Sequence, residues 1–124
     1  MKNVLVVDDE ADILKLVSVI LQIRGYQVPE PKNGSEALSK LYANPPSLMV
    51  LDIKLPDFTG WELLNRINNS PQILPDFPVV VMTASITETI FDLEAYPRVA
   101  QVIIKPFSAA RLIAAVEQSL SHRT

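Results

Sequence analysis

Short apolar runs alternate along the chain with longer stretches in which apolar residues recur every three or four positions. The short runs contain few polar residues, which is typical of strands buried on both faces of a parallel sheet. They are Val4 to Val7, Leu48 to Leu51, Val79 to Met82 and Val102 to Ile104. The spacing in the longer stretches predicts helices with one apolar face. These helical stripes begin at Ile13, Ala37, Leu63 and Ala109, and the capping-box sequence Ser85 to Glu88 predicts one more helix from about Ile86.

Strand and helix alternate throughout, which predicts an α/β fold of the doubly wound, flavodoxin-like (βα)5 sandwich type. Such a fold needs a further strand between the first two helices, and the candidate is the segment Gln27 to Pro31. Pro29 and Pro31 each lack a backbone N–H, which confines this strand to an edge of the sheet. A five-stranded parallel sheet of order 2-1-3-4-5 also places its second strand at an edge. The topology and the prolines therefore agree.

The composition narrows the class of protein. The 124 residues are 48% apolar and suit one compact domain over residues 1–124. Cysteine is absent, which excludes disulfides and thiolate sites, and the net charge of −3 argues against a nucleic-acid surface. Asp8 and Asp9 end the first apolar run too early for a signal peptide, and Lys15 interrupts the apolar stretch Ile13 to Ile23. We therefore expect a cytoplasmic protein that binds neither membrane nor nucleic acid directly.

The ends of the strands carry the residues suited to chemistry. Ligands of a doubly wound fold bind beyond the carboxyl ends of the strands, where the strand order reverses. The first predicted strand brings Asp8 and Asp9 to this rim, the third Asp52, the fourth Thr83 and the fifth Lys105. Three carboxylates at one place repel one another unless a cation lies among them. Oxygen ligands without His or Cys favour Mg²⁺, or Mn²⁺ in its place, over zinc.

Thr83 and Lys105 suit an anion, because a hydroxyl and an ammonium can both donate to phosphoryl oxygens. A carboxylate between a divalent ion and such donors is suited to act as the nucleophile that forms an acyl phosphate. Taken singly, each residue also has an ordinary structural explanation. Asp8 and Asp9 can cap a helix, Thr83 can be a strand residue and Lys105 a solvated charge. These explanations give no reason for all five residues to share one rim.

Four motifs resemble the receiver (CheY-like) domain of two-component response regulators. They are Val4-Leu-Val-Val-Asp-Asp-Glu10, Asp52-Ile-Lys-Leu-Pro-Asp-Phe-Thr-Gly60, Thr83-Ala84 and Lys105-Pro-Phe107. The motifs stand in the family's order on the expected strands, and the resemblance covers essentially the whole chain. It implies that Asp52 is the phosphoacceptor.

The resemblance also implies roles for the other residues of the rim. Asp9 would bind Mg²⁺ directly and Asp8 largely through water, and Asp52 and the backbone carbonyl of Lys54 would complete the protein ligands. Thr83 and Lys105 would bind the phosphoryl group, together with the backbone N–H of Ala84. The Lys105–Pro106 peptide bond would be cis.

Two positions give further expectations. Many receivers carry an aromatic switch residue three positions before the lysine, where this chain has Val102. Valine is stiff at χ1, so we expect the signal to travel through the loop after Thr83 instead. Lys54 lies two residues after the acceptor, at the predicted mouth of the pocket, and we expect its ammonium to slow dephosphorylation.

The function implied is that of a phosphoacceptor in a two-component phosphorelay. Asp52 would receive a phosphoryl group from a histidine kinase or phosphotransfer protein, and a downstream protein would read the change. We expect a monomer or weak homodimer, and a signalling protein that assists its own phosphoryl transfer and dephosphorylation rather than an enzyme. The alternative is a phosphorylation-independent protein-binding module on the same fold. An FMN carrier is disfavoured, because Asp8, Asp9 and Glu10 would repel a phosphate after the first strand.

Overall fold

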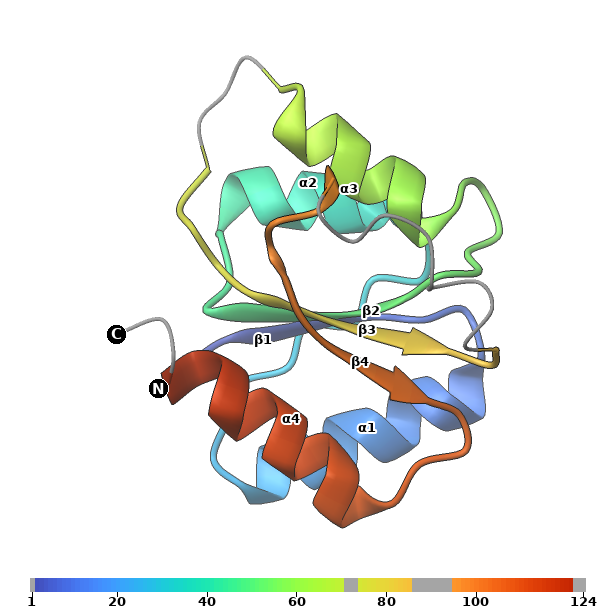
Figure 1. Cartoon of the computed structure of the whole chain (residues 1–124), viewed down its shortest axis with the longest axis vertical. Helices are drawn as coiled ribbons and strands as arrows, with labels where there is room; N and C mark the ends of the chain where they lie inside the picture. The colour runs from blue at the N-terminus through green and yellow to red at the C-terminus, as the bar shows by residue number, and fades with distance from the viewer. Residues whose placement is uncertain (1, 71–73, 86–94, 122–124) are drawn as a thin grey trace.

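The computed structural model describes residues 2–70, 74–85 and 95–121. These residues form four strands and four helices, with α1 followed directly by α2 and β3 followed by β4 (Figure 1). In chain order they are β1 (Val4–Val7), α1 (Ala11–Ile23), α2 (Gly34–Ala43), β2 (Leu48–Asp52), α3 (Gly60–Asn68), β3 (Val79–Thr83), β4 (Val99–Ile104) and α4 (Ala109–Ser121). The helix predicted from about Ile86 falls outside the described residues. Within the described ranges, no helix combines the length and the apolar character that crossing a membrane requires.

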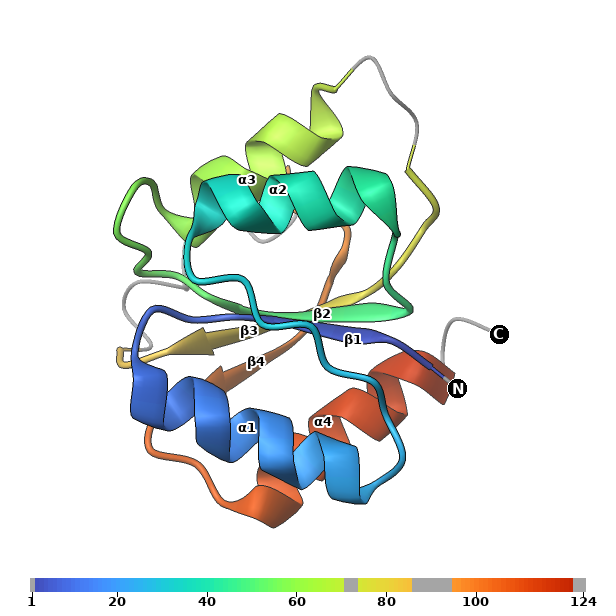
Figure 2. The same cartoon turned by 180° about the vertical axis from the view of Figure 1, so that it is seen from behind.

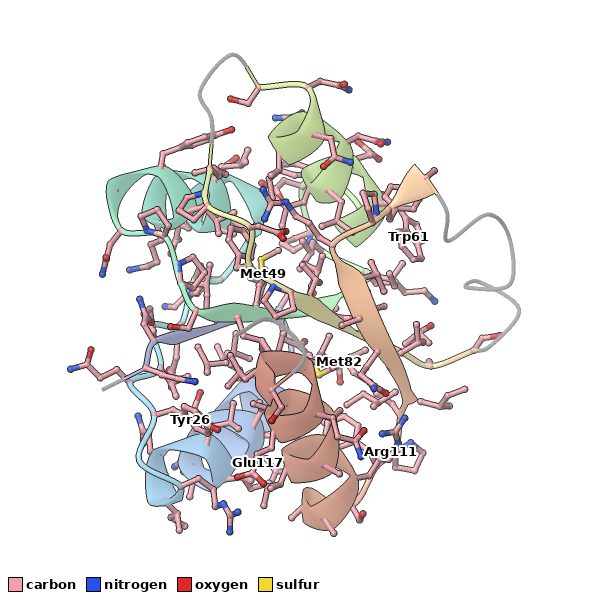
Figure 3. The ribbon with its side chains drawn as sticks, turned by 60° about the vertical axis from the view of Figure 1, so that its left-hand side comes forward. Tyr26, Met49, Trp61, Met82, Arg111 and Glu117 are labelled. Atoms are coloured by element: carbon pink, nitrogen blue, oxygen red, sulfur yellow. The ribbon has the colours of Figure 1, made fainter. Side chains whose placement is uncertain are left out.

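The four strands form one parallel sheet in the order β1-β2-β3-β4, and helices cover both of its faces. Helices α2 and α3 lie on one face and α1 and α4 on the other, as the two opposite views show (Figures 1 and 2). Every residue of β1, β2 and β3 is buried. Met49 and Met82 show how the side chains of neighbouring strands divide between the two cores (Figure 3). The first three apolar runs are therefore strands covered on both faces, as predicted. The fourth run is not: in β4 only Ile103 is buried, and Ile104 is 40% exposed.

The segment 27–31 lies beside β1, at the predicted edge, but the described sheet has four strands rather than five. Only one parallel bridge forms there, between Asn3 and Gln27. The N–H of Gln27 donates to the Lys2 carbonyl at 2.9 Å, and the carbonyls of Gln27 and Pro29 accept from β1 at 2.8 and 3.3 Å. Pro29 has no N–H to return a bond, so the ladder stops after a single bridge.

The last strand begins earlier than the apolar run predicts, at Val99 rather than Val102. Arg98, just before it, donates to the carbonyls of Pro75 and Phe77 at 2.8 and 3.3 Å, and its guanidinium lies 4.4 Å from the centre of the Phe77 ring. These contacts fasten the start of β4 beside the start of β3. The backbone carbonyl of Arg98 also accepts from the N–H of Val79 at 2.7 Å, so pairing is already in place before Val102.

Candidate functional site

The carboxyl ends of the four strands bring most of the predicted site residues to one rim. Asp8 directly follows β1, Asp52 and Thr83 are the last residues of β2 and β3, and Lys105 directly follows β4. Asp8, Asp52 and Thr83 are all at least 95% buried, with exposed fractions of 0%, 4% and 1%. Buried polar groups of this kind must be satisfied by partners, so their contacts define the chemistry of the site.

Lys105 is the central cation of the rim. Its Nζ lies 3.0 Å from Asp8 Oδ2, 3.2 Å from Asp52 Oδ2 and 3.4 Å from Glu10 Oε1. The lysine side chain is only 12% exposed, so its pairs with Asp8 and Asp52 are largely desolvated, whereas the Glu10 side chain is 61% exposed. Burial lowers the pKa of the Lys105 ammonium, but the carboxylates of Asp8 and Asp52 outweigh burial and raise it. Lys105 is therefore a fixed positive charge beside the predicted acceptor.

Three carboxylates surround this ammonium. Oxygens of Asp8, Glu10 and Asp52 all lie within 4.8 Å of one another. Three negative charges then share one lysine, and the donors are oxygens alone, which is the donor set that Mg²⁺ prefers. The residues present therefore fit a hard divalent cation.

Glu10 is the member of this group that the strand-end pattern missed. It lies one residue beyond the Asp8–Asp9 pair, at the N-cap of α1, and its N–H donates to Asp8 Oδ1 at 2.9 Å. Asp9, by contrast, is exposed and is not among the three carboxylates that the described residues bring together. The signal for Glu10 was present in the sequence, because an acidic residue at a helix start near a predicted cation site is a candidate ligand.

The Asp52 carboxyl has an unusual protonation equilibrium. Burial, followed by repulsion from Asp8, raises its pKa from 3.8 to about 6. Lys105 and the N–H of Lys54, which donates to Asp52 Oδ1 at 3.2 Å, act in the opposite direction. A carboxylate that is costly to ionise without more positive charge is suited to hold a cation and to act as a nucleophile.

Thr83 faces a different partner in this structure. Its hydroxyl donates to the Ser85 carbonyl at 3.0 Å and accepts from the Ser85 N–H at 3.2 Å. Its backbone carbonyl accepts from the N–H of Lys105 at 2.7 Å, which links the ends of β3 and β4. The Lys105–Pro106 peptide bond is cis, as the resemblance implies. Val102, at the position that is aromatic in many receivers, is half-buried against the core on the α2 and α3 face.

The loop after the acceptor is positioned by a close approach at Gly60. The Gly60 N–H donates to the Ile53 carbonyl at 2.7 Å, and a Cβ at Gly60 would lie 2.7 Å from the backbone oxygen of Asp52. Only glycine fits so near the acceptor's main chain. Thr59 and Glu62 then form a capping box that starts α3. The loop therefore leaves β2 and enters α3 along a fixed path.

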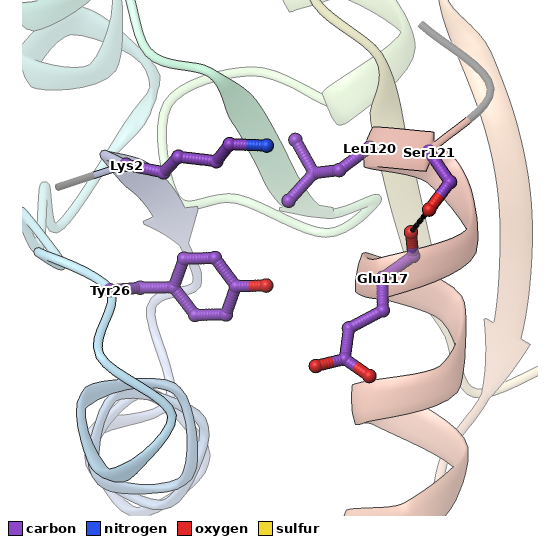
Figure 4. Close-up of a pocket in the computed structure, with 5 residues that line it drawn as sticks. All are labelled: Lys2, Tyr26, Glu117, Leu120 and Ser121. Carbon is purple, nitrogen blue, oxygen red and sulfur yellow. Dashed lines mark hydrogen bonds between the residues drawn. The ribbon is translucent and has the colours of Figure 1, made fainter. Parts of the chain in front are cut away.

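A cavity of about 380 Å³ lies at the opposite end of the sheet, beside the start of β1 (Figure 4). It is lined by Lys2, Tyr26, Glu117, Leu120 and Ser121. The Glu117 carboxylate is paired with Arg24 at 2.8 Å, and both side chains are nearly half exposed. Burial, followed by the Glu117 charge, raises the pKa of the Tyr26 hydroxyl. None of the predicted site residues lines this cavity, so the rim at the carboxyl ends remains the candidate site.

Comparisons with known proteins show the family to which the chain belongs. The family model of the response regulator receiver domain matches residues 4–117. Response regulator RR06 of Streptococcus pneumoniae is 39% identical over 115 residues, which are 90% of this chain and 49% of RR06. The receiver protein CpdR of Brucella abortus is 31% identical over 120 residues, which are 97% of this chain and 98% of CpdR.

The chain spans about half the length of RR06 and of several other curated relatives, some of which are named as transcriptional regulators. The expectation that this chain itself makes no direct contact with nucleic acid therefore stays a prediction.

Solved structures show the same fold. A CheY-like receiver domain protein from Methanospirillum hungatei superposes with a TM-score of 0.86 at 30% identity, covering 99% of this chain and 96% of that one. The response regulator TrrA from Thermotoga maritima, solved in complex with Mg²⁺–BeF, gives a TM-score of 0.81 at 31% identity and covers 95% of this chain and 98% of TrrA. The chain belongs to the response regulator receiver domains of two-component systems and has their CheY-like α/β fold.

Proposed function

We propose that Asp52 accepts a phosphoryl group from a histidine kinase or phosphotransfer protein. One observation carries the proposal: the Asp52 carboxylate is buried among two other carboxylates and one lysine at the carboxyl end of the sheet. In the reaction an Asp52 oxygen attacks phosphorus, the phosphorus–nitrogen bond of the donor's phosphohistidine breaks, and an acyl phosphate forms. The imidazole leaves with the electron pair of the broken bond.

Mg²⁺, with Mn²⁺ able to replace it, is the cation that this donor set suits. When bound, it would neutralise charge on the phosphoryl oxygens. We propose that Asp8, Asp9, Asp52 and the backbone carbonyl of Lys54 hold it, and the position of Glu10 adds one further candidate ligand. The relative TrrA, whose structure contains Mg²⁺–BeF, supports this choice of metal.

Lys105 and Thr83 would stabilise the transferred group. The Lys105 ammonium already lies 3.2 Å from Asp52 Oδ2. At this distance it would also stabilise the negative charge on a phosphoryl group that becomes bonded to Asp52. The Thr83 hydroxyl, which bonds to the Ser85 main chain, would have to exchange that partner for a phosphoryl oxygen. Such an exchange would couple the chemistry to the loop after β3, and it offers a route for the signal that needs no aromatic residue at Val102.

In this proposal the chain is a signalling phosphoacceptor rather than an enzyme with an external substrate. A downstream protein reads the phosphorylated state as a shift between two conformations. A binding module that is indifferent to phosphorylation would have no use for three carboxylates around one lysine. The acidic rim therefore favours the phosphoacceptor over that alternative.

The test is the intact mass of the protein after incubation with Mg²⁺ and acetyl phosphate. A gain of one phosphoryl group that is lost with EDTA and lost in Asp52→Ala is the expected result. If the folded protein binds Mg²⁺ but gains no mass, the same measurement is repeated with a phosphorylated histidine phosphotransfer protein. No gain from either donor would overturn the proposal.

A further inference from the structure

Asp57 makes a set of contacts that the phosphoacceptor chemistry does not require. It lies in the loop between β2 and α3, yet its carboxylate binds the start of α2, more than twenty positions earlier in the chain. Its oxygens accept from the N–H of Gly34 at 2.9 Å, from the N–H of Ser35 at 3.0 Å and from the Ser35 hydroxyl at 2.9 Å. The neighbouring N–H of Phe58 donates to the same carboxylate at 3.1 Å.

This carboxylate completes the N-terminus of α2. Asn33 satisfies the next two donors of the helix, because its side chain accepts from Glu36 N–H at 2.8 Å and its carbonyl from Ala37 N–H at 3.0 Å. The first two donors, on Gly34 and Ser35, depend on Asp57. A negative charge is favoured at this end of a helix. Desolvation alone would raise the pKa of Asp57, but the hydrogen bonds from Gly34 and Ser35 hold it below its ordinary value.

Phe58 adds a second link between the loop and the helix. The ring packs so closely on Gly34 that a Cβ there would overlap the edge of the Phe58 ring. The guanidinium of Arg66, on α3, lies 4.2 Å from the centre of the same ring. Asp57 and Phe58 together fasten the middle of the loop to α2.

The first part of the same loop touches the acceptor. The N–H of Lys54 donates to Asp52 Oδ1 at 3.2 Å, and Lys54 stands only three residues before Asp57. The two remaining residues, Leu55 and Pro56, leave little slack, since Pro56 has a fixed φ. The position of the Lys54 main chain therefore depends on where Asp57 is held.

We propose that Asp57 is a positioning residue of the phosphoacceptor site: by fastening the loop to the start of α2, it holds the main chain of Lys54 against Asp52. The consequence for metal binding and phosphorylation rests on the proposed function, whereas the effect on the loop does not. Asp57 touches neither the acceptor nor the predicted ligands, so it would act entirely through the backbone.

The test compares Asp57→Ala with Asn33→Ala. Both variants remove hydrogen bonds from the N-terminus of α2, but only Asp57→Ala releases the loop, so Asn33→Ala controls for loss of helix stability. Asp57→Asn keeps an acceptor oxygen and serves as the conservative variant. Each protein is measured for hydrogen exchange at the Lys54 amide by NMR, for Mg²⁺ affinity by titration, and for its initial rate of phosphorylation by acetyl phosphate.

We expect Asp57→Ala to speed exchange at the Lys54 amide and to weaken Mg²⁺ binding by about tenfold, the lower end for loss of a residue that orients a ligand. Asn33→Ala should change neither quantity, and Asp57→Asn should lie between wild type and Asp57→Ala. Equal effects of Asp57→Ala and Asn33→Ala, or an unchanged Lys54 amide in Asp57→Ala, would overturn the inference. A wild-type protein that takes no phosphoryl group would instead refute the proposed function, and the Lys54 exchange would still decide the role of Asp57.

Discussion

Lys105 and Asp8 form a buried ion pair, with 3.0 Å between Nζ and Oδ2 and an Asp8 side chain that is fully enclosed. Arg24 and Glu117 are closer, at 2.8 Å, but both of those side chains are nearly half exposed. Judged by distance alone, the exposed pair would be expected to stabilise the fold more. Burial reverses this order. Lys105 and Asp8 have lost their contact with water, so removing either one would leave the other as an uncompensated buried charge.

Replacing Lys105 with Met should destabilise the metal-free protein by about 3 kcal/mol, since three neighbouring carboxylates would lose their shared cation. Added Mg²⁺ should recover most of the loss, because the cation would replace the missing charge. Urea denaturation with and without Mg²⁺ measures both effects. Arg24→Ala is the matched control and should cost less than about 1 kcal/mol, with no dependence on Mg²⁺. A Lys105→Met protein as stable as wild type without metal would contradict the prediction.

The raised pKa of Asp52 predicts a pH dependence of stability. Asp52 ionises near 3.8 in the unfolded chain and near 6 in the metal-free fold. Between pH 3.8 and about pH 6 the folded protein therefore holds a proton on Asp52 that the unfolded chain has lost. The stability that this proton provides is complete below about pH 4 and is lost as pH rises through 6. Asp52→Asn removes the contribution. The difference in unfolding free energy between Asp52→Asn and wild type should therefore grow from pH 4 to pH 7 in favour of the variant.

Mg²⁺ provides the control for this titration. A bound cation lowers the pKa of a neighbouring carboxyl, so the pH-dependent difference between the two proteins should shrink when Mg²⁺ is present. Chemical denaturation at several pH values, with EDTA or with Mg²⁺, separates the cases. A difference that does not change with pH in EDTA would show that Asp52 has an ordinary pKa.

The sheet and the rim could be predicted because local sequence determines them. Continuous apolar runs such as Val79 to Met82 have no polar face, so helices must cover both sides. Each run then ends at a residue that the strand itself carries to the rim, which is why Asp52 and Lys105 meet although 53 positions separate them. The family follows from the same residues, and the comparisons confirm it.

Other features depend on orientation, which a linear pattern does not contain. The residues of segment 27–31 suit an edge strand, but whether Pro29 faces β1 or solvent decides how much of a ladder forms. Asp57 looks like an ordinary turn residue in the sequence, and its link to Gly34 arises only when α2 is placed. Glu10 can be recognised in the sequence as an acidic residue at a helix start, next to the Asp8–Asp9 pair. That its carboxylate lies close to Asp52 becomes clear only when the first turn of α1 is placed.

Gly60→Ala should disrupt both the fold and the site. The new Cβ would meet the Asp52 carbonyl oxygen at 2.7 Å and the Ile53 Cα at 3.1 Å, and these are backbone atoms that cannot turn aside. We expect a loss of stability of about 2 kcal/mol or more, as for overpacking elsewhere, and a slower reaction with acetyl phosphate.

Gly25→Ala is the control for Gly60→Ala. Gly25 has a φ of +93°, and nothing lies within 4 Å of an added Cβ, so only backbone strain is introduced, at a cost of about 1 kcal/mol. This variant should react with acetyl phosphate at the wild-type rate, because Gly25 lies between α1 and the edge segment. Identical losses of stability and reactivity in the two variants would show that the close approach at Gly60 has no special role.

Lys54→Asn should shorten the lifetime of phosphorylated Asp52. The Lys54 backbone is held at the acceptor by the bond from its N–H to Asp52 Oδ1, so its exposed side chain starts beside the acceptor. An ammonium at that place can bind phosphoryl oxygens and keep the attacking water out of line, whereas the shorter, neutral Asn cannot. We expect hydrolysis to become about three to ten times faster, which is at most about 1.4 kcal/mol of barrier.

Loss of the phosphoryl mass with time measures the rate. Lys15→Asn, an equal change of charge on the exposed surface of α1, should leave it unchanged. If both variants keep the wild-type lifetime, Lys54 contributes its main chain to the site and its side chain only to the solvated surface.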